Sequence, residues 1–131
     1  MSAKILLFDI ENTPSVVYMW SMYDKWFNEE MIKEPWYILC WSAKWLGSKE
    51  IISSALPDFK NAYKKNPKDD KPILQKLWKL LDEADIVVAH NGKAFDVRKV
   101  NARFSMNNMK PPSGYKVVDT LLAARQYFYF T

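Results

Sequence analysis

KILLFDIE (residues 4–11) is an apolar run that ends in two acidic residues, Asp9 and Glu11. In a β-strand the side chains alternate between faces, so residues two apart point to the same side. Two carboxylates that lie together without a basic partner repel each other, and a divalent cation between them relieves that repulsion. The segment therefore predicts a buried strand with a cation site at its end.

A second apolar run, IVVAHNGKAFD (residues 86–96), ends in another acidic residue, Asp96. Asp96 would bring a third carboxylate to the place where Asp9 and Glu11 lie. Carboxylate oxygens are hard ligands that suit Mg²⁺ or Mn²⁺ rather than Zn²⁺. The two runs together therefore predict a magnesium or manganese site.

Both segments resemble the motifs of the DEDD 3′–5′ exonucleases, which belong to the ribonuclease H-like superfamily. The similarity is greatest to the proofreading domains of family B DNA polymerases and to their stand-alone phage relatives. Asp9 and Glu11 match the first motif of this family, whereas Asn91, Phe95 and Asp96 match its second motif.

The segment VVDTLL (residues 117–122) also resembles the strand-to-helix turn that follows the second motif. The resemblance therefore covers nearly the whole chain. It implies a ribonuclease H-like α/β fold, in which a mixed sheet of three antiparallel strands and then parallel strands is flanked by helices. We expect residues 1–131 to form a single domain of this kind that is incomplete at its carboxyl end.

The function that this resemblance implies is a metal-dependent 3′–5′ exonuclease. Such an enzyme releases nucleoside 5′-monophosphates from single-stranded or frayed DNA 3′ ends, and RNA is an alternative substrate. Two Mg²⁺ or Mn²⁺ ions would be held by the catalytic residues Asp9, Glu11 and Asp96, with Asp9 bridging both ions. The residues expected to bind substrate are Thr13, Asn91, Lys93 and Phe95.

The family also has a fourth carboxylate in a third motif, Tyr-x-x-x-Asp or His-x-x-x-x-Asp, on a late helix. A literal match runs from Tyr115 to Asp119, but the prolines and glycine of residues 111–114 interrupt any helix before it. Residues 116–118 favour a strand, and Asp119 suits the N-cap of a helix that begins at Thr120. We therefore interpret this match as coincidental and expect the third motif to be absent.

Several residues near the second motif have two interpretations. Asn91 either closes the strand-to-helix turn by hydrogen bonding or contacts substrate, and Gly92 lets the backbone approach a strand or a nucleotide. Phe95 is expected in the core, with a wedge against the terminal bases as the alternative. His90 is expected to make a structural hydrogen bond rather than to act as a general base. Lys93 is either an exposed lysine or a phosphate contact.

Three further interpretations concern residues outside the motifs. Thr13 could touch the terminal nucleotide through its backbone or its hydroxyl. The lysines of residues 57–71, interleaved with Asp69 and Asp70, indicate a solvated loop, with tracking of a single-stranded backbone as the alternative. The lone cysteine, Cys40, is expected in the core.

The expected elements follow from hydrophobic periodicity and turn residues. Strands are expected at residues 4–11, 36–46, 50–55 and 85–90, with a turn at Gly47-Ser48, and the strand at 85–90 is expected to be covered on both faces. Helices are expected at residues 72–84 and 94–108, followed by a short strand and a final helix. The connection at residues 12–34 is expected to be partly helical around residues 21–32.

Composition bounds the class of partner and the location. A net charge of +4 suits a nucleic-acid partner, and the six Trp, seven Tyr and seven Phe residues suit core packing first and base stacking second. No signal peptide or membrane span is evident. We therefore expect a cytoplasmic protein, including one encoded by a phage in the cytoplasm of its host.

The expected absence of the third motif leaves a second functional hypothesis. The chain would then be a non-catalytic nucleic-acid-binding or assembly fragment, which needs a partner chain for the last acidic ligand. Apolar surface around Phe128, Tyr129 and Phe130 would be exposed. This surface predicts self-association or binding of a second chain.

Overall fold

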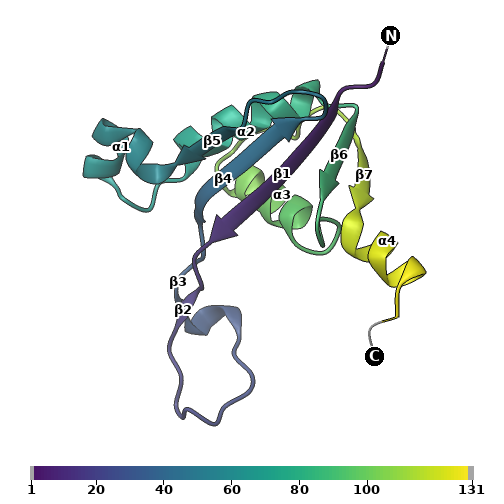
Figure 1. Cartoon of the computed structure of the whole chain (residues 1–131). Coiled ribbons are helices and arrows are strands. Elements are labelled where there is room, and N and C mark those ends of the chain that lie inside the picture. Colours follow the sequence, from purple (N-terminus) through teal and green to yellow (C-terminus); the bar gives the residue numbers. More distant parts are fainter. Residues whose placement is uncertain (1, 130–131) are drawn as a thin grey trace.

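A five-stranded mixed sheet forms the centre of the computed structural model, which describes residues 2–129 (Figure 1). The middle strand β1 (Ile5–Asn12) pairs antiparallel with β4 (Ile38–Trp45), and β4 pairs antiparallel with β5 (Ile52–Ala55). On the other side of β1, β6 (Ile86–Ala89) and then β7 (Lys116–Asp119) run parallel to it. The predicted order of three antiparallel strands and then parallel strands is confirmed.

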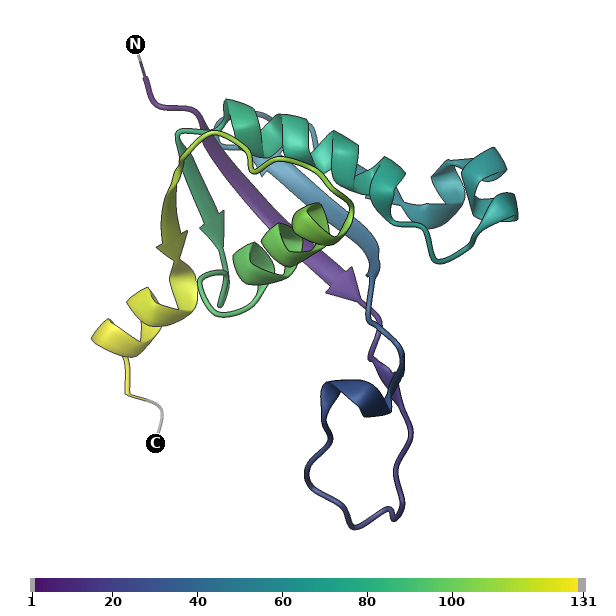
Figure 2. The same ribbon diagram turned by 180° about the vertical axis from the view of Figure 1, so that it is seen from behind.

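Two helices, α2 (Lys71–Glu83) and α3 (Asp96–Met106), lie side by side on one face of this sheet (Figure 2). The shorter α1 (Lys60–Lys65) projects beyond β5, and α4 (Thr120–Tyr127) follows β7 (Figure 1). The predicted helices at residues 72–84 and 94–108 and the final helix are confirmed. No helix in the described part of the chain is both long and apolar enough to span a membrane.

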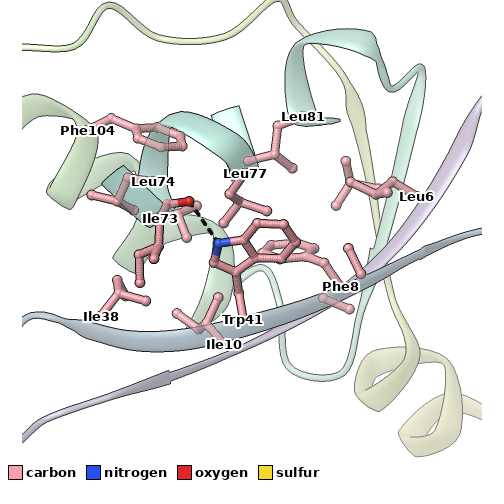
Figure 3. Packing of buried hydrophobic residues seen from close by; sticks show 14 of the residues in the cluster. Leu6, Phe8, Ile10, Ile38, Trp41, Ile73, Leu74, Leu77, Leu81 and Phe104 are labelled. Atoms are coloured by element: carbon pink, nitrogen blue, oxygen red, sulfur yellow. Dashed lines mark hydrogen bonds between the residues drawn. The ribbon is translucent and has the colours of Figure 1, made fainter. Parts of the chain in front are cut away.

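The hydrophobic core lies between the sheet and helices α2 and α3 (Figure 3). Trp41 of β4 is at its centre, where the indole Nε1 donates a hydrogen bond of 2.8 Å to the carbonyl of Ile73. Each large apolar side chain that is buried in this way contributes about 1.5–3 kcal/mol. The other large core residues are Leu6, Phe8, Ile10, Ile38, Leu74, Leu77, Leu81, Val87, Val100 and Phe104.

The opposite face of the sheet is uncovered by any helix described for residues 2–129 (Figure 1). Because side chains alternate along β1, residues of the core are interleaved with the half-buried Leu7 and the exposed Asp9 and Glu11. The prediction that the strand at residues 85–90 is covered on both faces is wrong, since both α2 and α3 lie on the same side. Val88 of β6 is accordingly only half-buried. We call this surface the open face.

The lysines of residues 57–71 are exposed as predicted, but part of this segment is helical rather than a loop. The segment contains the 3₁₀ turn η2 (Leu56–Asp58), which begins one residue earlier, and the helix α1. The charged residue Asp70 is fully buried, although it stands beside lysines in the sequence. An aspartate loses its hydration when it is buried, so it requires partners inside the protein.

Asp70 obtains those partners from β4 and from α3 with its C-cap residue. The Arg103 guanidinium of α3 binds both carboxylate oxygens, with Nε and Nη2 at 2.7 and 2.8 Å. The backbone N–H of Ile38 donates a third bond of 2.9 Å, and the Asn107 side chain donates a fourth of 3.0 Å. Asp70 therefore fastens the start of α2 to β4 and to α3.

The connection between β1 and β4 is mostly extended rather than helical. It forms a short ribbon of β2 (Val16–Val17) and β3 (Ile32–Glu34), and only the 3₁₀ turn η1 (Glu29–Met31) is helical. Two local bonds, from the Ser21 N–H to the Asp24 carboxylate and from the Tyr23 N–H to the Ser21 hydroxyl, compete with a helix. The predicted helix around residues 21–32 is therefore wrong.

The end of the described chain exposes apolar side chains, as the sequence predicts. Phe128 is 60% exposed and Tyr129 is 93% exposed. Phe130, the third residue of that prediction, lies outside the described residues.

Replacing Asp70 with alanine should lower the free energy of unfolding by about 3–5 kcal/mol, because the Arg103 guanidinium would stay buried without its carboxylate. Urea denaturation followed by tryptophan fluorescence measures this loss. Lys68→Ala is the control, since it removes an exposed ion pair with Glu34 and should cost far less. Equal losses in the two variants would contradict the role assigned to Asp70.

Candidate functional site

Asp9 and Glu11 lie on the open face near the carboxyl end of β1, and both are exposed. In the pairing with β4, Asp9 is opposite Ser42 and Glu11 is opposite Cys40. Residues that pair across two strands share a face of the sheet. The structure therefore brings the two predicted carboxylates to one side of the central strand, as the alternation along the strand predicts.

Asp96 approaches the same end of β1 from a different element. It is the first residue of α3, it is only 2% exposed, and its Oδ1 accepts a hydrogen bond of 3.2 Å from the Ile10 N–H. The pairing of β1 with β6 covers Ile5 to Leu7 and does not reach Ile10. The Asp96 carboxylate therefore accepts the hydrogen bond from Ile10 that a longer β6 strand would otherwise accept.

The electrostatic potential at this end of β1 is negative. Burial raises the pKa of Asp96, the Ile10 N–H bond opposes that effect, and the nearby Asp9 carboxylate raises the pKa further. The pKa of the Cys40 thiol is raised by burial first and then by the charges of Glu11 and Asp9. None of the ion pairs within residues 2–129 involves Asp9, Glu11 or Asp96. The three carboxylates therefore have no ion-pair partner among the described side chains.

The expected convergence of all three carboxylates at one point is absent. Within residues 2–129, no group of three or more His, Cys, Asp or Glu side chains is arranged to hold a metal ion. The reason is that Asp96 is buried against the Ile10 N–H, whereas Glu11 extends from the open face. The chemistry of the ligands nevertheless fits Mg²⁺ or Mn²⁺. All three carboxylates are hard oxygen ligands, and none of them has an ion-pair partner among the described residues.

The turn between β6 and α3 sets the position of Asp96. Asn91 has a left-handed φ of 59°, and its carbonyl accepts a bond of 2.9 Å from the Phe95 N–H. A Cβ on Gly92 would lie 2.5 Å from the Cβ of Ala89, so only glycine fits against β6 here. Asn91 thus closes the turn through its backbone, and the close approach predicted for Gly92 is to a strand.

Asp119 fastens this turn to the next strand. Its two carboxylate oxygens accept hydrogen bonds from the Asn91 N–H at 2.9 Å and from the Lys93 N–H at 3.1 Å. It also caps α4 by accepting a bond of 3.0 Å from the Leu121 N–H. Tyr115 lies outside any helix and Asp119 ends β7, so the prediction that these two residues do not share a helix is confirmed.

The pKa of Asp119 is lowered despite its burial. Loss of hydration is the largest influence and raises the pKa, but the backbone N–H bonds together outweigh it. These donors are the N–H groups of Lys93, Leu121, Asn91 and Leu122. Asp119 is therefore held as a carboxylate that stabilises the turn before Asp96.

Two expectations of burial are wrong. Phe95 is 37% exposed, because it stands at the N-cap of α3, and the Lys99 ammonium lies 5.6 Å from its ring centre. Cys40 is only half-buried, because its pairing with Glu11 turns it toward the open face. The alternative for Phe95, contact with terminal bases, stays a prediction.

A shallow groove of about 500 Å³ runs along the open face beside Asp9. Its walls include two residues that the sequence interpretation missed, Ser42 and Lys44 of β4. The alternation of residues 40, 42 and 44 with the core residues Trp41 and Ala43 is the signal that could have identified them. Lys44 supplies the groove with a positive charge.

His90 also lines this groove, where its Nδ1 is 3.0 Å from the Thr120 hydroxyl. The predicted structural hydrogen bond of His90 is therefore confirmed. Thr13 is similarly engaged, since its N–H bonds to the Tyr37 carbonyl and its hydroxyl accepts a bond from the Tyr37 N–H, both at 3.0 Å. The side chain of Lys93 is exposed. Substrate contacts of Thr13, Asn91 and Lys93 stay predictions.

The lysines around α1 are exposed, as the solvated interpretation predicts. Lys68 pairs with Glu34 at 2.6 Å, and this pairing raises the pKa of the lysine and lowers that of the glutamate. The remaining members of the group are Lys60, Lys64, Lys65 and Lys71.

The comparisons with known proteins agree with this architecture. Residues 43–129 match the family model of the RNase_H superfamily, and the chain belongs to this superfamily. The structure is also similar to the family B DNA polymerase from the hyperthermophilic archaeon Pyrobaculum calidifontis, with a TM-score of 0.65 and 12% sequence identity. No match was found among curated protein sequences.

That similarity covers 97% of this chain but only 16% of the archaeal polymerase. At such low identity the similarity shows the fold alone. The predicted ribonuclease H-like fold, and its resemblance to a family B polymerase, are therefore confirmed.

Replacing Asp119 with asparagine should lower the melting temperature at pH 7, because an amide cannot accept all of the N–H bonds that the carboxylate accepts. The pKa of Asp119 is lower in the folded state than its ordinary value of 3.8, so the ionised form stabilises the fold above that pH. This stabilisation disappears as the pH falls through the lowered pKa. The difference between the two proteins should therefore shrink in acid, as measured by thermal unfolding across pH. The exposed Glu50→Gln is the control, and a pH-independent difference would contradict this account.

Proposed function

We propose that this chain is a metal-dependent 3′–5′ exonuclease that acts on single-stranded or frayed DNA 3′ ends. Membership of the RNase_H superfamily supports a nuclease that binds nucleic acid. The observation that carries the proposal is that Asp9 and Glu11 share the open face of β1 and that Asp96 reaches the same end of this strand, although the three side chains do not converge on one point. We assign residues 1–131 to a single domain, since β1 pairs with strands from both halves of the chain.

Asp9, Glu11 and Asp96 would hold two Mg²⁺ or Mn²⁺ ions, which ribonuclease H-like nucleases typically use. When bound, such ions lower the pKa of a water molecule and neutralise charge on the phosphate. In the overall reaction, water oxygen bonds to phosphorus and the bond from phosphorus to the preceding 3′ oxygen breaks. The products are a nucleoside 5′-monophosphate and a strand that ends in a 3′ hydroxyl.

The groove on the open face supplies the remaining contacts of this proposal. Leu7 and Val88 offer apolar surface to the terminal nucleotide, and the Lys44 ammonium offers a positive charge to a phosphate. The buried Asp96 keeps the start of α3 against β1, so that its carboxylate stays near Asp9, which lines the groove. Substrate contacts from Thr13, Asn91, Lys93 and Phe95 complete the proposed site.

A second candidate function is supported by the commitment of Asp119 to the turn and to the cap of α4. Asp119 is thus an unsuitable fourth ligand, and the family pattern has four carboxylates. A non-catalytic nucleic-acid-binding or assembly fragment, completed by a partner chain that brings the last acidic ligand, would use the same open face. Metal binding without cleavage would select this second function.

The test is cleavage of a 3′-labelled single-stranded DNA oligonucleotide with Mg²⁺ or Mn²⁺. We expect metal-dependent release of labelled mononucleotides, with a loss of at least about 100-fold in Asp9→Ala and Asp96→Asn, because loss of even outer partners of a metal site costs about 10–100-fold. Glu83→Ala removes an exposed carboxylate at the far end of α2 and should leave the rate unchanged.

Three outcomes would count against the exonuclease. Cleavage that survives Asp9→Ala would indicate a contaminating nuclease or another site. Release of internal fragments rather than mononucleotides would indicate an endonuclease. Faster cleavage of an RNA oligonucleotide of the same sequence would indicate that RNA, not DNA, is the substrate.

A further inference from the structure

The loop between β2 and β3 exposes a group of large apolar side chains, which we call the aromatic loop (residues 18–27). Figure 1 shows that it projects away from the sheet, beyond the end of β1. Trp20 is 96% exposed and Trp26 is 87% exposed, which is close to complete exposure in the folded chain. The other large apolar members are Tyr18, Met19, Met22, Tyr23 and Phe27.

Local polar bonds, rather than burial, shape this loop. The Ser21 N–H donates to the Asp24 carboxylate at 2.9 Å, and the Tyr18 N–H donates to the Met31 carbonyl at 2.7 Å. These bonds hold the backbone in a defined path while the rings face solvent. Surfaces that gather large apolar side chains in this way usually bind a partner.

The root of the loop is close to the candidate site. β1 carries Asp9 and Glu11, and the chain then runs directly through Thr13 into β2 at Val16. An extended chain spans at most about 3.5 Å per residue, so Tyr18 lies within roughly 25 Å of Glu11. A single strand that continues past the carboxylates in the direction of β1 would run toward the loop, which projects beyond the end of this strand (Figure 1).

We infer that the aromatic loop is a stacking platform for bases of the single strand whose 3′ end lies at Asp9 and Glu11. This inference rests on the proposed function, because it needs a nucleic-acid substrate at that site. Five of the seven exposed apolar side chains are aromatic, and aromatic rings stack on bases of any sequence. The Lys33 ammonium, 5.8 Å from the Tyr18 ring centre, adds a positive charge at the base of the loop.

The low charge of the loop argues against an anionic lipid surface and leaves stacking, rather than charge, to carry affinity for bases. Interfacial segments that bind lipids carry several lysines or arginines, whereas residues 18–27 contain one, Lys25, and also Asp24. Trp20 and Trp26 are therefore the side chains expected to carry affinity for single-stranded DNA. Each ring should contribute about 5- to 100-fold to binding.

The experiment measures the affinity of a fluorescent single-stranded oligonucleotide by anisotropy, with every protein carrying Asp9→Ala to prevent cleavage. Trp20→Ala and Trp26→Ala should each weaken binding by about 5- to 100-fold. Met22→Ala is the matched control, because Met22 is 94% exposed but has no ring, and it should bind as the parent does. Equal melting temperatures of all four proteins check that the fold is unchanged.

The inference is overturned if both tryptophan variants bind as the parent does, or if Met22→Ala weakens binding equally. It is also overturned if the tryptophan variants change only self-association in light scattering or only binding to phosphatidylserine vesicles. Failure of the exonuclease itself is distinguishable, because binding in this assay does not require cleavage. Absence of cleavage by the protein that retains Asp9, together with tryptophan-dependent binding in this assay, would reject the exonuclease and keep the platform.

Discussion

The hydrogen bond from the Ile10 N–H to Asp96 is the interaction on which the candidate site depends. The short β6 pairs with only the first part of β1, so the edge of β1 would otherwise be left without a partner at Ile10. A buried N–H without an acceptor is costly, and a carboxylate is a strong acceptor. By filling this position, Asp96 docks α3 against the sheet and carries its negative charge to the neighbourhood of Asp9.

The one-sided packing of the helices explains why such charges are tolerated. Helices α2 and α3 bury one face of the sheet, and the alternation along β1 then directs Asp9 and Glu11 to the face that stays hydrated. Asp119 helps to position Asp96 indirectly, since it accepts hydrogen bonds from the backbone of the turn that precedes Asp96. The same strand, β1, thus supplies core residues on one face and the acidic residues of the candidate site on the other.

Much of this arrangement could be predicted from local patterns. Strand alternation was sufficient to place Asp9 and Glu11 on one face, and the proline-rich stretch before Tyr115 was sufficient to reject a helical motif there. The failures concern contacts between distant segments. Asp70 stands among lysines in the sequence, and only the approach of Arg103 from α3 makes its burial possible. Phe95 is apolar, but its place at a helix start turns it outward.

The central claim is that Asp9, Glu11 and Asp96 together hold a divalent cation. Paramagnetic broadening of backbone amide signals by substoichiometric Mn²⁺ tests it most directly, because broadening falls steeply with distance from the ion. The account predicts selective broadening of residues 9–11 and of residues 95–97, with loss of the effect in Asp9→Ala. Broadening centred elsewhere in the chain, or no selective broadening at all, would contradict it.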